Sequence, residues 1–469
     1  MKAIRLLVLL ALLPTFLIAQ DNEKNYAEAY QLIDTWLSTQ QQFDQLPGLS
    51  LAVVEDQKVL WSGAYGFANE DVKTETATLC SICSISKLFT AVAVMQLYDQ
   101  GKVRLDDTVD KFLPNYNVAQ QFPDSGPITL RSLLSHSSGL PRESAYPYWT
   151  GDFYFPTRQE IEGRFQNQQT LYPASTYYQY SNLALTLLGE IVEEVSGMSY
   201  GDYVKQNILD PLKLNNTFPE MPKEKFGQQL AVGQTALQSD GNRLKLPLYQ
   251  SQGVAPAMGF ASNVLDLAAF AQWQFRLRDS TITEILKPST LRLMQQVHFT
   301  DPNWKVTRGL GFGVWKGPNG TTWVGHGGSC PGYRSTLQLD LKNKMAYTAM
   351  INASGTNPGK YTRGVYQILS KVEKTKEETK DLSEYIGTYS NNPWWYATYL
   401  GSWNGRLVSL SLPVDQPGEN MTFFKHIEGD VFRRVRDDKE LGEELEFIRD
   451  VNGKVVKYKV HDNFYPRMD

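Results

Sequence analysis

The chain has 469 residues, of which 42% are hydrophobic, 12% aromatic and 20% charged. A composition so near the globular average excludes a collagen, a coiled coil and a disordered tail protein, and the length predicts two or three domains. Its 46 basic and 50 acidic side chains give a formal net charge of −4 without any basic tract. We therefore expect neither a nucleic-acid partner nor an anionic-membrane partner.

The amino-terminal segment has the pattern of a secretory signal. Lys2 and Arg5 precede an apolar run over residues 6–18, and the small residue Ala19 follows it. The run is too short to span a bilayer comfortably. We therefore predict a signal peptide over residues 1–19, a periplasmic or secreted mature protein, and no integral membrane span.

Apolar periodicity predicts the first elements of the main domain. Helical spacing indicates an amphipathic helix over residues 25–43, and two strand-like runs follow at residues 49–54 and 59–65. A helix over residues 84–100 ends at Gly101, a residue type that suits a helix C-terminus. Because that helix is apolar on nearly every side, we expect it to be fully buried.

Helices dominate the middle of this domain, and strands return near its end. The clearest helical segments cover residues 128–135, 158–165, 182–195 and 262–275. Strands are expected at residues 311–315, 321–325, 333–340 and 344–352, and a last helix at residues 361–377. Strands at both ends with helices between them favour an α+β fold, in which an antiparallel sheet is flanked by helices and carries an inserted helical subdomain.

The pattern changes to short alternating segments after the charged run at residues 374–380, which we interpret as a solvated helix end and linker. These segments cover residues 384–389, 395–400, 407–412, 421–425, 431–434, 445–449 and 455–460. Strands at such regular spacing predict a small antiparallel β-barrel. The predicted organisation is therefore a signal peptide, a main domain over residues 20–378 and a barrel over residues 379–469.

The sharpest candidate for chemistry is the segment Ser84-Ile85-Ser86-Lys87. One helical turn places the hydroxyl of Ser84 and the amine of Lys87 on the same face of the helix. A serine becomes a nucleophile when a base takes its proton, and burial lowers the pKa of a lysine toward that role. The helix start also offers a backbone N–H to an acyl oxyanion. The competing interpretation, a capping Ser84 with a solvated Lys87, is opposed by the apolar surroundings of Lys87.

The second candidate is Tyr180-Ser181-Asn182, at the start of a predicted helix. A tyrosine near a lysine ammonium can be held partly as phenolate, and so can act as a general base or proton shuttle. The amide of Asn182 can hold both the lysine and a substrate amide. The same tripeptide recurs at residues 389–391, and we discard that copy because it lies in the predicted barrel.

The third candidate is Gly325-His326-Gly327-Gly328-Ser329, between two strand-like runs. Glycines let a backbone approach a ligand closely, and the N–H of Ser329 can serve as a second oxyanion donor. We expect His326 to titrate near neutral pH and to bias the substrate charge or relay protons. The alternative is a glycine-rich hairpin with a structural histidine.

The cysteines and histidines favour neither a redox site nor a metal site. Cys80 and Cys83 form a C-x-x-C pair without the βαβ context of a redox motif, so we interpret them as small buried side chains at a strand-to-helix junction. The five histidines lack metal-ligand spacing, and we predict no metal and no cofactor.

In this order, the three candidate segments resemble the motifs of the penicillin-recognising serine hydrolases, in the branch of class C β-lactamases, D-aminopeptidases, D-alanyl-D-alanine carboxypeptidases and related esterases. Residues 101–107, 128–141 and 258–262 are also similar to family segments, so the resemblance covers residues 25–370. The segment from residue 382 is similar to the lipocalin-like barrels that some members carry.

The resemblance implies the family's α/β sandwich with a helical subdomain and assigns roles to single residues. Ser84 would be acylated, and Lys87 and Tyr180 would form the acid/base pair. Positions that would hold the substrate are Asn182, His326, Gly328 and Ser329.

The chain departs from the family pattern at the third motif. The β-lactamases and most carboxypeptidases have a lysine there that helps to bind the substrate carboxylate, whereas this chain has His326 and no K-[ST]-G. This departure favours the esterase and peptidase members. Arg334 is an alternative carboxylate anchor or a surface arginine, and a contact between Cys83 and Cys330 stays open.

We therefore expect an exported serine hydrolase that cleaves an ester or a peptide-like amide of a small-molecule or peptide substrate. The alternatives are a β-lactamase, a penicillin-binding DD-peptidase, or a non-catalytic cell-wall or β-lactam sensor. The intact Ser84, Lys87 and Tyr180 argue against the sensor. An α/β-hydrolase lacks support because G-x-S-x-G is absent. The aromatic segment at residues 146–155 either walls the pocket or packs as an ordered loop, and the oligomeric state is left open.

Overall fold

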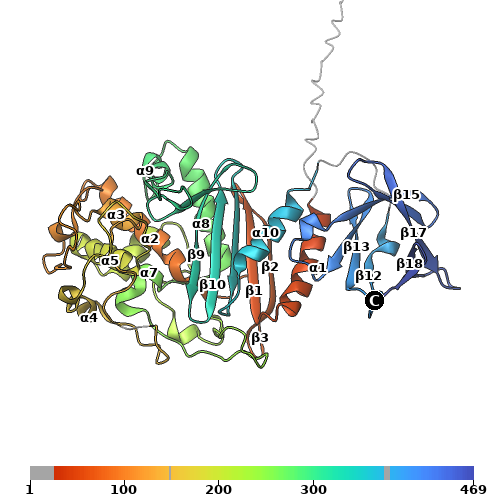
Figure 1. Ribbon diagram of the computed structural model, residues 1–469, viewed down its shortest axis with the longest axis horizontal. Helices are drawn as coiled ribbons and strands as arrows, with labels where there is room; N and C mark the ends of the chain where they lie inside the picture. Colours follow the sequence, from red (N-terminus) through yellow and green to blue (C-terminus); the bar gives the residue numbers. More distant parts are fainter. Residues whose placement is uncertain (1–25, 147–148, 374–380, 469) are drawn as a thin grey trace, which may run out of the picture.

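The computed structural model describes residues 26–146, 149–373 and 381–468. A lobe of helices, a central sheet and a separate small barrel follow one another along the longest axis of the molecule (Figure 1). The predicted signal peptide and the charged run at residues 374–380 lie outside the described residues. Within the described part, no helix is long and apolar enough to cross a membrane.

The central sheet is antiparallel, with nine strands in the order β3-β2-β1-β11-β10-β9-β8-β7-β6. Its strands are β1 (Gly48–Glu55), β2 (Lys58–Asn69), β3 (Val72–Lys73), β6 (Phe299–Thr300), β7 (Thr307–Arg308), β8 (Gly313–Lys316), β9 (Thr322–Cys330), β10 (Tyr333–Asp340) and β11 (Met345–Ile351). The first and last strands of the domain are neighbours, since β1 pairs with β11 along its whole length. This pairing confirms a sheet assembled from both ends of the domain. A further pair, β4 (Cys80–Ser81) and β5 (Ala261–Ser262), lies apart from this sheet.

Both faces of the sheet are covered by helices. The helices are α1 (Ala27–Phe43), α2 (Ser86–Asp99), α3 (Leu130–Leu134), α4 (Arg158–Glu162), α5 (Asn182–Ser196), α6 (Tyr200–Val204), α7 (Ala255–Met258), α8 (Val264–Asp279), α9 (Pro288–Met294) and α10 (Pro358–Leu369). Side chains of β1 alternate between the two faces: Ala52 and Val54 join the core with α2, α5 and α8, whereas Leu49, Leu51 and Val53 join the core with α1 and α10. The α+β prediction is confirmed.

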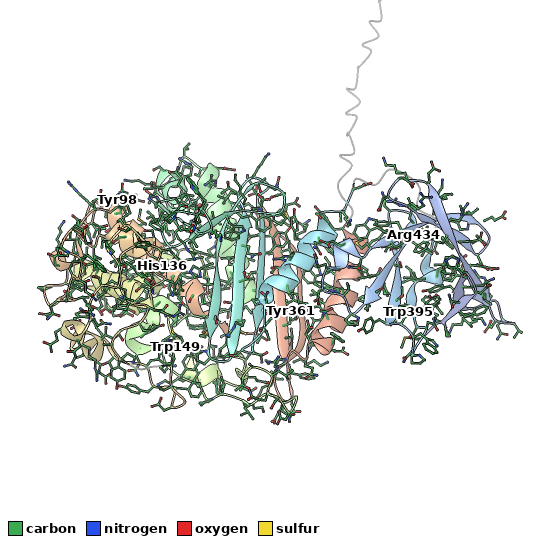
Figure 2. All side chains as sticks on the ribbon, in the orientation of Figure 1. Tyr98, His136, Trp149, Tyr361, Trp395 and Arg434 are labelled. Atoms are coloured by element: carbon green, nitrogen blue, oxygen red, sulfur yellow. A yellow bond between two sulfur atoms is a disulfide. The ribbon has the colours of Figure 1, made fainter. Side chains whose placement is uncertain are left out.

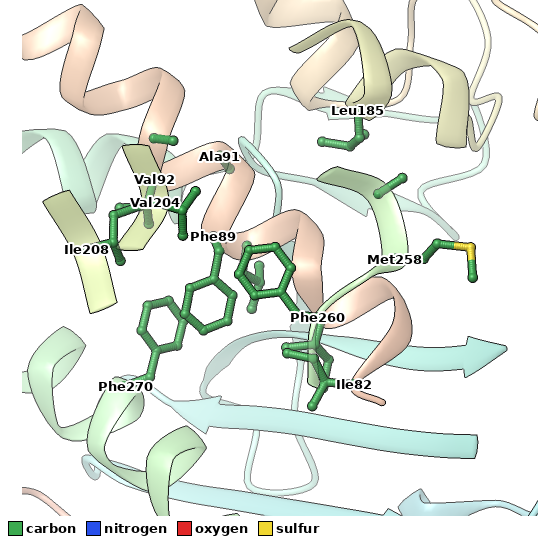
Figure 3. Close-up of a cluster of buried hydrophobic side chains, with 14 of the residues drawn as sticks. Ile82, Phe89, Ala91, Val92, Leu185, Val204, Ile208, Met258, Phe260 and Phe270 are labelled. Atoms are coloured by element: carbon green, nitrogen blue, oxygen red, sulfur yellow. The ribbon is translucent and has the colours of Figure 1, made fainter. Parts of the chain in front are cut away.

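Helix α2 runs through the centre of the helical lobe. Every residue from its start to Leu97 is buried, as its apolar sequence predicts. Phe89 stacks between Phe260 and Phe270 at ring-centroid distances of 5.1 and 4.5 Å (Figure 3). Such burial contributes about 2–3 kcal/mol for each large apolar side chain. The helix ends at Asp99, and the N–H groups of Gly101 and Lys102 bond back to the oxygens of Tyr98 and Leu97 in the last turn.

The carboxyl-terminal domain is an eight-stranded antiparallel barrel. Its strands, in spatial order, are β12 (Gly387–Tyr389), β13 (Ala397–Trp403), β14 (Arg406–Leu412), β15 (Thr422–Glu428), β16 (Val431–Val435), β17 (Leu441–Arg449), β18 (Val455–Val460) and β19 (Asn463–Pro466). A bridge between Tyr389 and Arg467 joins the first and last strands. Sequence analysis missed β19, because its side chains are mostly exposed and carry no buried–exposed alternation.

Two other elements have boundaries that differ from the predictions. The last helix of the main domain, α10, spans Pro358–Leu369 instead of residues 361–377, because Asn357 caps its start through a hydrogen bond to Gly359 N–H. Strand β9 continues to Cys330, so the third motif lies inside a strand and not between two strands. The glycine-rich hairpin that we considered as the alternative is present, with the motif on its first strand, β9, and with β10 as its second strand.

Candidate active site

Ser84 lies where the sheet meets the central helix. It belongs to a short 3-10 turn, η1 (Cys83–Ile85), directly before α2. A disulfide joins Cys83 to Cys330 at the end of β9, and Cys80 remains a buried free thiol. The disulfide answers the question that the sequence left open. Cys80 and Cys83 are both buried at the junction of β4 and α2, as interpreted from the sequence, and Cys83 in addition forms this disulfide. The link fixes the segment that carries Ser84 against β9.

Gly328 allows β9 to approach this segment closely. A Cβ on that residue would lie 2.3 Å from the backbone oxygen of Ile82 and 2.1 Å from the hydroxyl of Ser335. The Ser335 hydroxyl in turn donates to the Ile82 oxygen at 2.8 Å. The glycine at this motif position is therefore required by the distance between two backbones.

Lys87 is completely buried beneath Ser84. Its Nζ lies 3.2 Å from Ser84 Oγ, 2.8 Å from Asn182 Oδ1 and 2.7 Å from the backbone oxygen of Ala257. Burial lowers the pKa of the Lys87 amine well below its ordinary value, against the attraction of Glu143. The nearby guanidinium of Arg142 lowers the pKa further. The predicted pairing of serine and lysine on one helix face is thus present in the structure.

Tyr180 lies above the lysine, immediately before α5. Its ring stacks on His136 at 4.4 Å, and Lys87 Nζ lies 4.9 Å from the ring centroid. Burial raises the pKa of Tyr180 to about 12, although a hydrogen bond with Ser84 acts in the opposite direction. The expected phenolate is therefore wrong, because a phenol with a pKa raised to about 12 keeps its proton at neutral pH.

His136, which Figure 2 marks in the helical lobe, also fixes the start of α5. Its Nδ1 accepts the backbone N–H of Ser181 at 3.1 Å. The hydroxyl of Ser181 caps α5 by accepting the N–H of Ala184 at 2.9 Å. These two contacts explain why the second motif can present a fixed tyrosine ring.

Asn182, the first residue of α5, connects the lysine to a residue that sequence analysis missed. While its Oδ1 accepts from Lys87, its Nδ2 donates to both carboxylate oxygens of Glu143, at 2.9 and 3.0 Å. The carboxylate therefore fixes the orientation of the amide. Glu143 also accepts the indole N–H of Trp149 at 2.8 Å, which ties the aromatic segment to this network. Residues 147–148 of that segment lie outside the described residues.

His326 is a buried, neutral side chain of β9. Burial lowers its pKa to about 3, and the charges of Lys87 and Arg308 lower it further. The expectation of titration near neutral pH is therefore wrong. Its Nδ1 lies 2.6 Å from the oxygen of Gly327, an acceptor, so Nδ1 carries the proton. Its Nε2 is buried without a hydrogen-bond partner among the described residues.

A cavity of about 810 Å³ opens over Ser84. Predicted site residues that line it are Ser84, Tyr180, His326, Gly328, Ser329 and Arg334. Lys87 and Asn182 lie behind this wall. The half-buried Arg334 bonds through its guanidinium to the backbone oxygens of Cys330 and Tyr333, at 2.9 and 2.7 Å. All eight predicted residues therefore lie in or directly behind one cavity.

The charges on the cavity wall have one sign. Besides Arg334, the wall includes Arg142, Lys305 and Arg308, and no acidic side chain among the described residues lines it. Sequence analysis missed these three cations because they come from separate loops and from the two-residue strand β7, without a motif. Arg308 donates to the hydroxyl of Tyr178 at 2.5 Å.

Comparison with known proteins finds similarity over most of the chain. A family model described as beta-lactamase matches residues 33–369. The Dictyostelium discoideum protein "Beta-lactamase-like protein 2" is 25% identical over 75% of this chain, and the match covers 64% of that protein. "Penicillin-binding protein 4*" of Bacillus subtilis is 32% identical over 39% of this chain and 40% of its own length.

A solved structure extends the similarity into the barrel. It is that of an octameric penicillin-binding protein homologue from Pyrococcus abyssi, with a TM-score of 0.65 and 24% sequence identity. The superposition covers 93% of this chain and 99% of the other chain. The two proteins therefore share a fold over both domains.

Proposed function

The chain belongs to the beta-lactamase family, and on this premise we propose that it is a serine hydrolase that forms an acyl-enzyme on Ser84. The observation that carries the proposal is the environment of Lys87. A neutral amine has two N–H groups, and two pure acceptors, Asn182 Oδ1 and the Ala257 oxygen, lie within 2.8 Å of Nζ. The lone pair is then left for the hydroxyl of Ser84, so that Lys87 is the general base.

The proposed reaction begins with transfer of the Ser84 proton to Lys87 Nζ while Oγ attacks the carbonyl carbon of the substrate. The backbone N–H groups of Ser84 and Ser329 are proposed as donors to the oxyanion. Tyr180, protonated at neutral pH and hydrogen-bonded to Ser84, gives its proton to the leaving group and regains one from the Lys87 ammonium. Water then attacks the acyl-enzyme by the reverse route.

For the substrate, we propose an ester or a D-amino-acid peptide in preference to a β-lactam. The neutral His326 occupies the position at which the β-lactamases carry a charged lysine. A carboxylate of the substrate would meet Arg334 instead, which lines the same cavity as Ser84. His326, which lines the cavity, is proposed to contact the bound substrate, and Asn182, which lies behind the wall, is proposed to hold Lys87 instead.

Acyl-enzyme formation can be tested with a labelled fluorophosphonate and a labelled penicillin, each followed by peptide mapping. We expect a covalent adduct on Ser84 and none in Ser84→Ala. Labelling elsewhere, or no labelling, would refute the proposal. A stable penicillin adduct without turnover of any substrate would instead favour the sensor alternative.

Substrate preference is tested by comparing aryl esters, D-amino-acid amides and a chromogenic cephalosporin under the same conditions. We expect kcat/KM for the best ester or amide to exceed that for the cephalosporin by at least about tenfold, the factor that corresponds to 1.4 kcal/mol in transition-state binding. Equal or faster cephalosporin hydrolysis would overturn the preference.

We also propose export to the periplasm or the medium. The support is the charged and then apolar sequence of residues 1–19. The domain limits near residue 380 are likewise proposed from the sequence. Expression of the full chain with a carboxyl-terminal tag would test export, because cleavage after Ala19 would appear in the amino-terminal sequence of the exported protein.

A further inference from the structure

A second cavity, of about 1010 Å³, adjoins the cavity over Ser84. Four residues line both cavities: Lys305, Thr307, Val314 and Trp315. The second cavity continues from them between the β8–β9 hairpin and helices α8 and α9. We call this second cavity the basic groove.

The groove concentrates positive charge in a protein whose net charge is negative. Its charged lining residues are Arg278, Arg292, Lys305, Lys316 and Lys342, and no acidic side chain among the described residues lines it. In the described part of the chain, none of these five cations forms a salt bridge within 4 Å. Asp279 attracts the Arg278 guanidinium and raises its pKa, but this carboxylate is mostly exposed and forms its salt bridge with Lys344 at 2.7 Å.

Two of the cations lie close together, and neither forms a salt bridge with an acid of the described residues. Arg278 donates to the neutral side chain of Gln295 at 2.9 Å, and Arg292 donates to the backbone oxygen of Arg278 at 2.7 Å. Burial lowers the pKa of the Arg278 guanidinium, and repulsion from Arg292 adds to this effect. An anion in the groove would relieve this repulsion.

The groove also borders an open strand edge. Strand β8 pairs with β9 through all four of its residues, but with β7 only at Gly313, opposite Arg308. Beyond Gly313 this edge of β8 has no strand partner in the part of the chain that the structure describes. The Thr307 hydroxyl donates to the Val314 oxygen on this edge, so the backbone groups open to a peptide begin after that oxygen, at Lys316. Trp315 and Lys316 lie on this stretch and line the groove. An extended peptide can add to such an edge through backbone hydrogen bonds.

We propose that the basic groove binds an acidic, extended peptide segment of the substrate, attached to the group that Ser84 attacks. The inference rests on the proposed hydrolase function, because the shared wall of the two cavities makes them parts of one site. The cations of the groove would bind carboxylate side chains of the peptide. Two tryptophans of the groove, Trp304 and Trp315, would cover the apolar parts of the peptide. Trp304 is 76% exposed.

Binding is tested with fluorescein-labelled tetraglutamate and tetraglutamine peptides by fluorescence anisotropy, using the full chain as Ser84→Ala. We expect tetraglutamate to bind at least about tenfold more tightly than tetraglutamine, and its affinity to fall with added salt. Equal affinities, or no salt dependence, would overturn the proposal.

A charge-reversal pair locates the site. Lys316→Glu/Lys342→Glu should weaken tetraglutamate binding about tenfold, since each reversal turns an attraction near the groove into a repulsion. The control Lys58→Glu/Lys102→Glu makes the same change in net charge at exposed positions outside the groove and should leave binding unchanged. Thermal melts of both variants verify folding, and equal weakening by both pairs would refute the assignment.

The class of occupant is tested by competition. Unlabelled polyglutamate should displace the probe, whereas polyphosphate and an acidic polysaccharide of equal charge concentration should compete at least about tenfold less well. Stronger competition by either would exclude a peptide-specific groove. Since the probe is measured in Ser84→Ala, failure of binding is distinguishable from failure of acylation, which is read in the native chain.

Discussion

Lys87 has an unusual position for a charged residue type, because its side chain is completely buried and its amine meets two acceptors and one hydroxyl. Burial of an ammonium is costly, and it lowers the pKa of the Lys87 amine well below its ordinary value. The same burial that makes Lys87 a poor cation makes it a suitable base for Ser84. The proposed acylation of Ser84 therefore depends mainly on Lys87.

Replacement of Lys87 should therefore abolish most acylation. In Lys87→Ala we expect the single-turnover rate of Ser84 acylation by an aryl ester to fall about 10²- to 10⁴-fold, the usual contribution of a general base. Rapid-mixing absorbance measurements give this rate. The matched control, Lys102→Ala at an exposed loop position, should keep the native rate. Loss of less than about tenfold in Lys87→Ala would contradict the assignment.

The pH dependence of kcat/KM should report Lys87 and not His326. The lowered pKa of Lys87 means that the base is present above that pKa and is lost as the pH falls through it. His326, whose pKa is lowered to about 3 by burial, stays neutral between pH 5 and 8. Native protein and His326→Asn should thus show the same midpoint of the acidic limb. Disappearance of that limb in His326→Asn would assign it to the histidine.

Sequence reasoning was strongest for residues that lie in compact motifs and weakest for their electrostatic state. Ser84, Lys87, Tyr180 and Asn182 were identified because their spacing and helix starts are local properties. The charge states of Tyr180 and His326 could not be predicted in this way, because they depend on burial and on cations that distant segments supply. Glu143 was missed for the same reason, since its contact with Asn182 exists only in the folded chain.

At the scale of elements, the disulfide between η1 and β9 joins parts of the chain that are 247 residues apart. In the chain-entropy model a loop of this length contributes about 5 kcal/mol to stability. Strands β1, β10 and β11 could be predicted from apolar runs, but this link could not, because it depends on how β9 lies against the nucleophile segment.

Removal of the disulfide should lower both stability and activity. For Cys83→Ser/Cys330→Ser we expect a lower free energy of unfolding, by up to about 5 kcal/mol, and a lower kcat/KM, since the link holds Ser84 against Gly328. Urea unfolding and ester hydrolysis measure the two effects. Cys80→Ser is the control and should leave the sensitivity to dithiothreitol unchanged. Insensitivity of the native stability to dithiothreitol would contradict the prediction.

Besides Lys87 of α2, a buried ionisable group lies on helix α5, the carboxyl group of Glu190. Both carboxylate oxygens of Glu190 are buried without a hydrogen-bond partner among the described residues. Burial raises the pKa of Glu190 to about 8, and repulsion from Glu162 adds to the effect. Since the pKa in the folded state exceeds that of the unfolded chain, the neutral form stabilises the fold at low pH and this contribution is lost as the pH rises to 8.

We therefore expect Glu190→Gln to gain stability relative to the native protein as the pH rises. Between pH 6 and 8 the relative gain should be about 2 kcal/mol, because each pH unit in this window contributes up to about 1.4 kcal/mol. Urea unfolding of both proteins at the two pH values gives the difference. A difference that does not change with pH would show that Glu190 titrates normally.

At the scale of the whole molecule, α1 and α10 lie between the sheet and the barrel, and their buried side chains form one apolar core with residues of both (Figure 1). Trp36 of α1 is fully buried, and its indole N–H donates to the backbone oxygen of Val414 in the barrel domain at 2.8 Å. Gly364 of α10 leaves room for this ring, since a Cβ there would lie 2.1 Å from it. The active-site cavity has no lining residue from the described part of the barrel.

This separation predicts that the contact between the domains affects stability and not catalysis. Trp36→Ala should lower the free energy of unfolding by about 3–5 kcal/mol, the usual cost of truncating a buried aromatic side chain, because it leaves a cavity and removes the bond to Val414. Below the transition temperature, kcat/KM for a small ester should stay within about twofold of the native value, since the neighbours of Ser84 and Lys87, Ile85 and Leu88, belong to the other core. Calorimetry and ester hydrolysis on the same samples measure both quantities.

The control is Trp394→Ala, which truncates a 76% exposed tryptophan of the barrel domain and should change neither the stability nor kcat/KM. A large loss of activity in folded Trp36→Ala would instead indicate that the barrel domain influences the arrangement of the site.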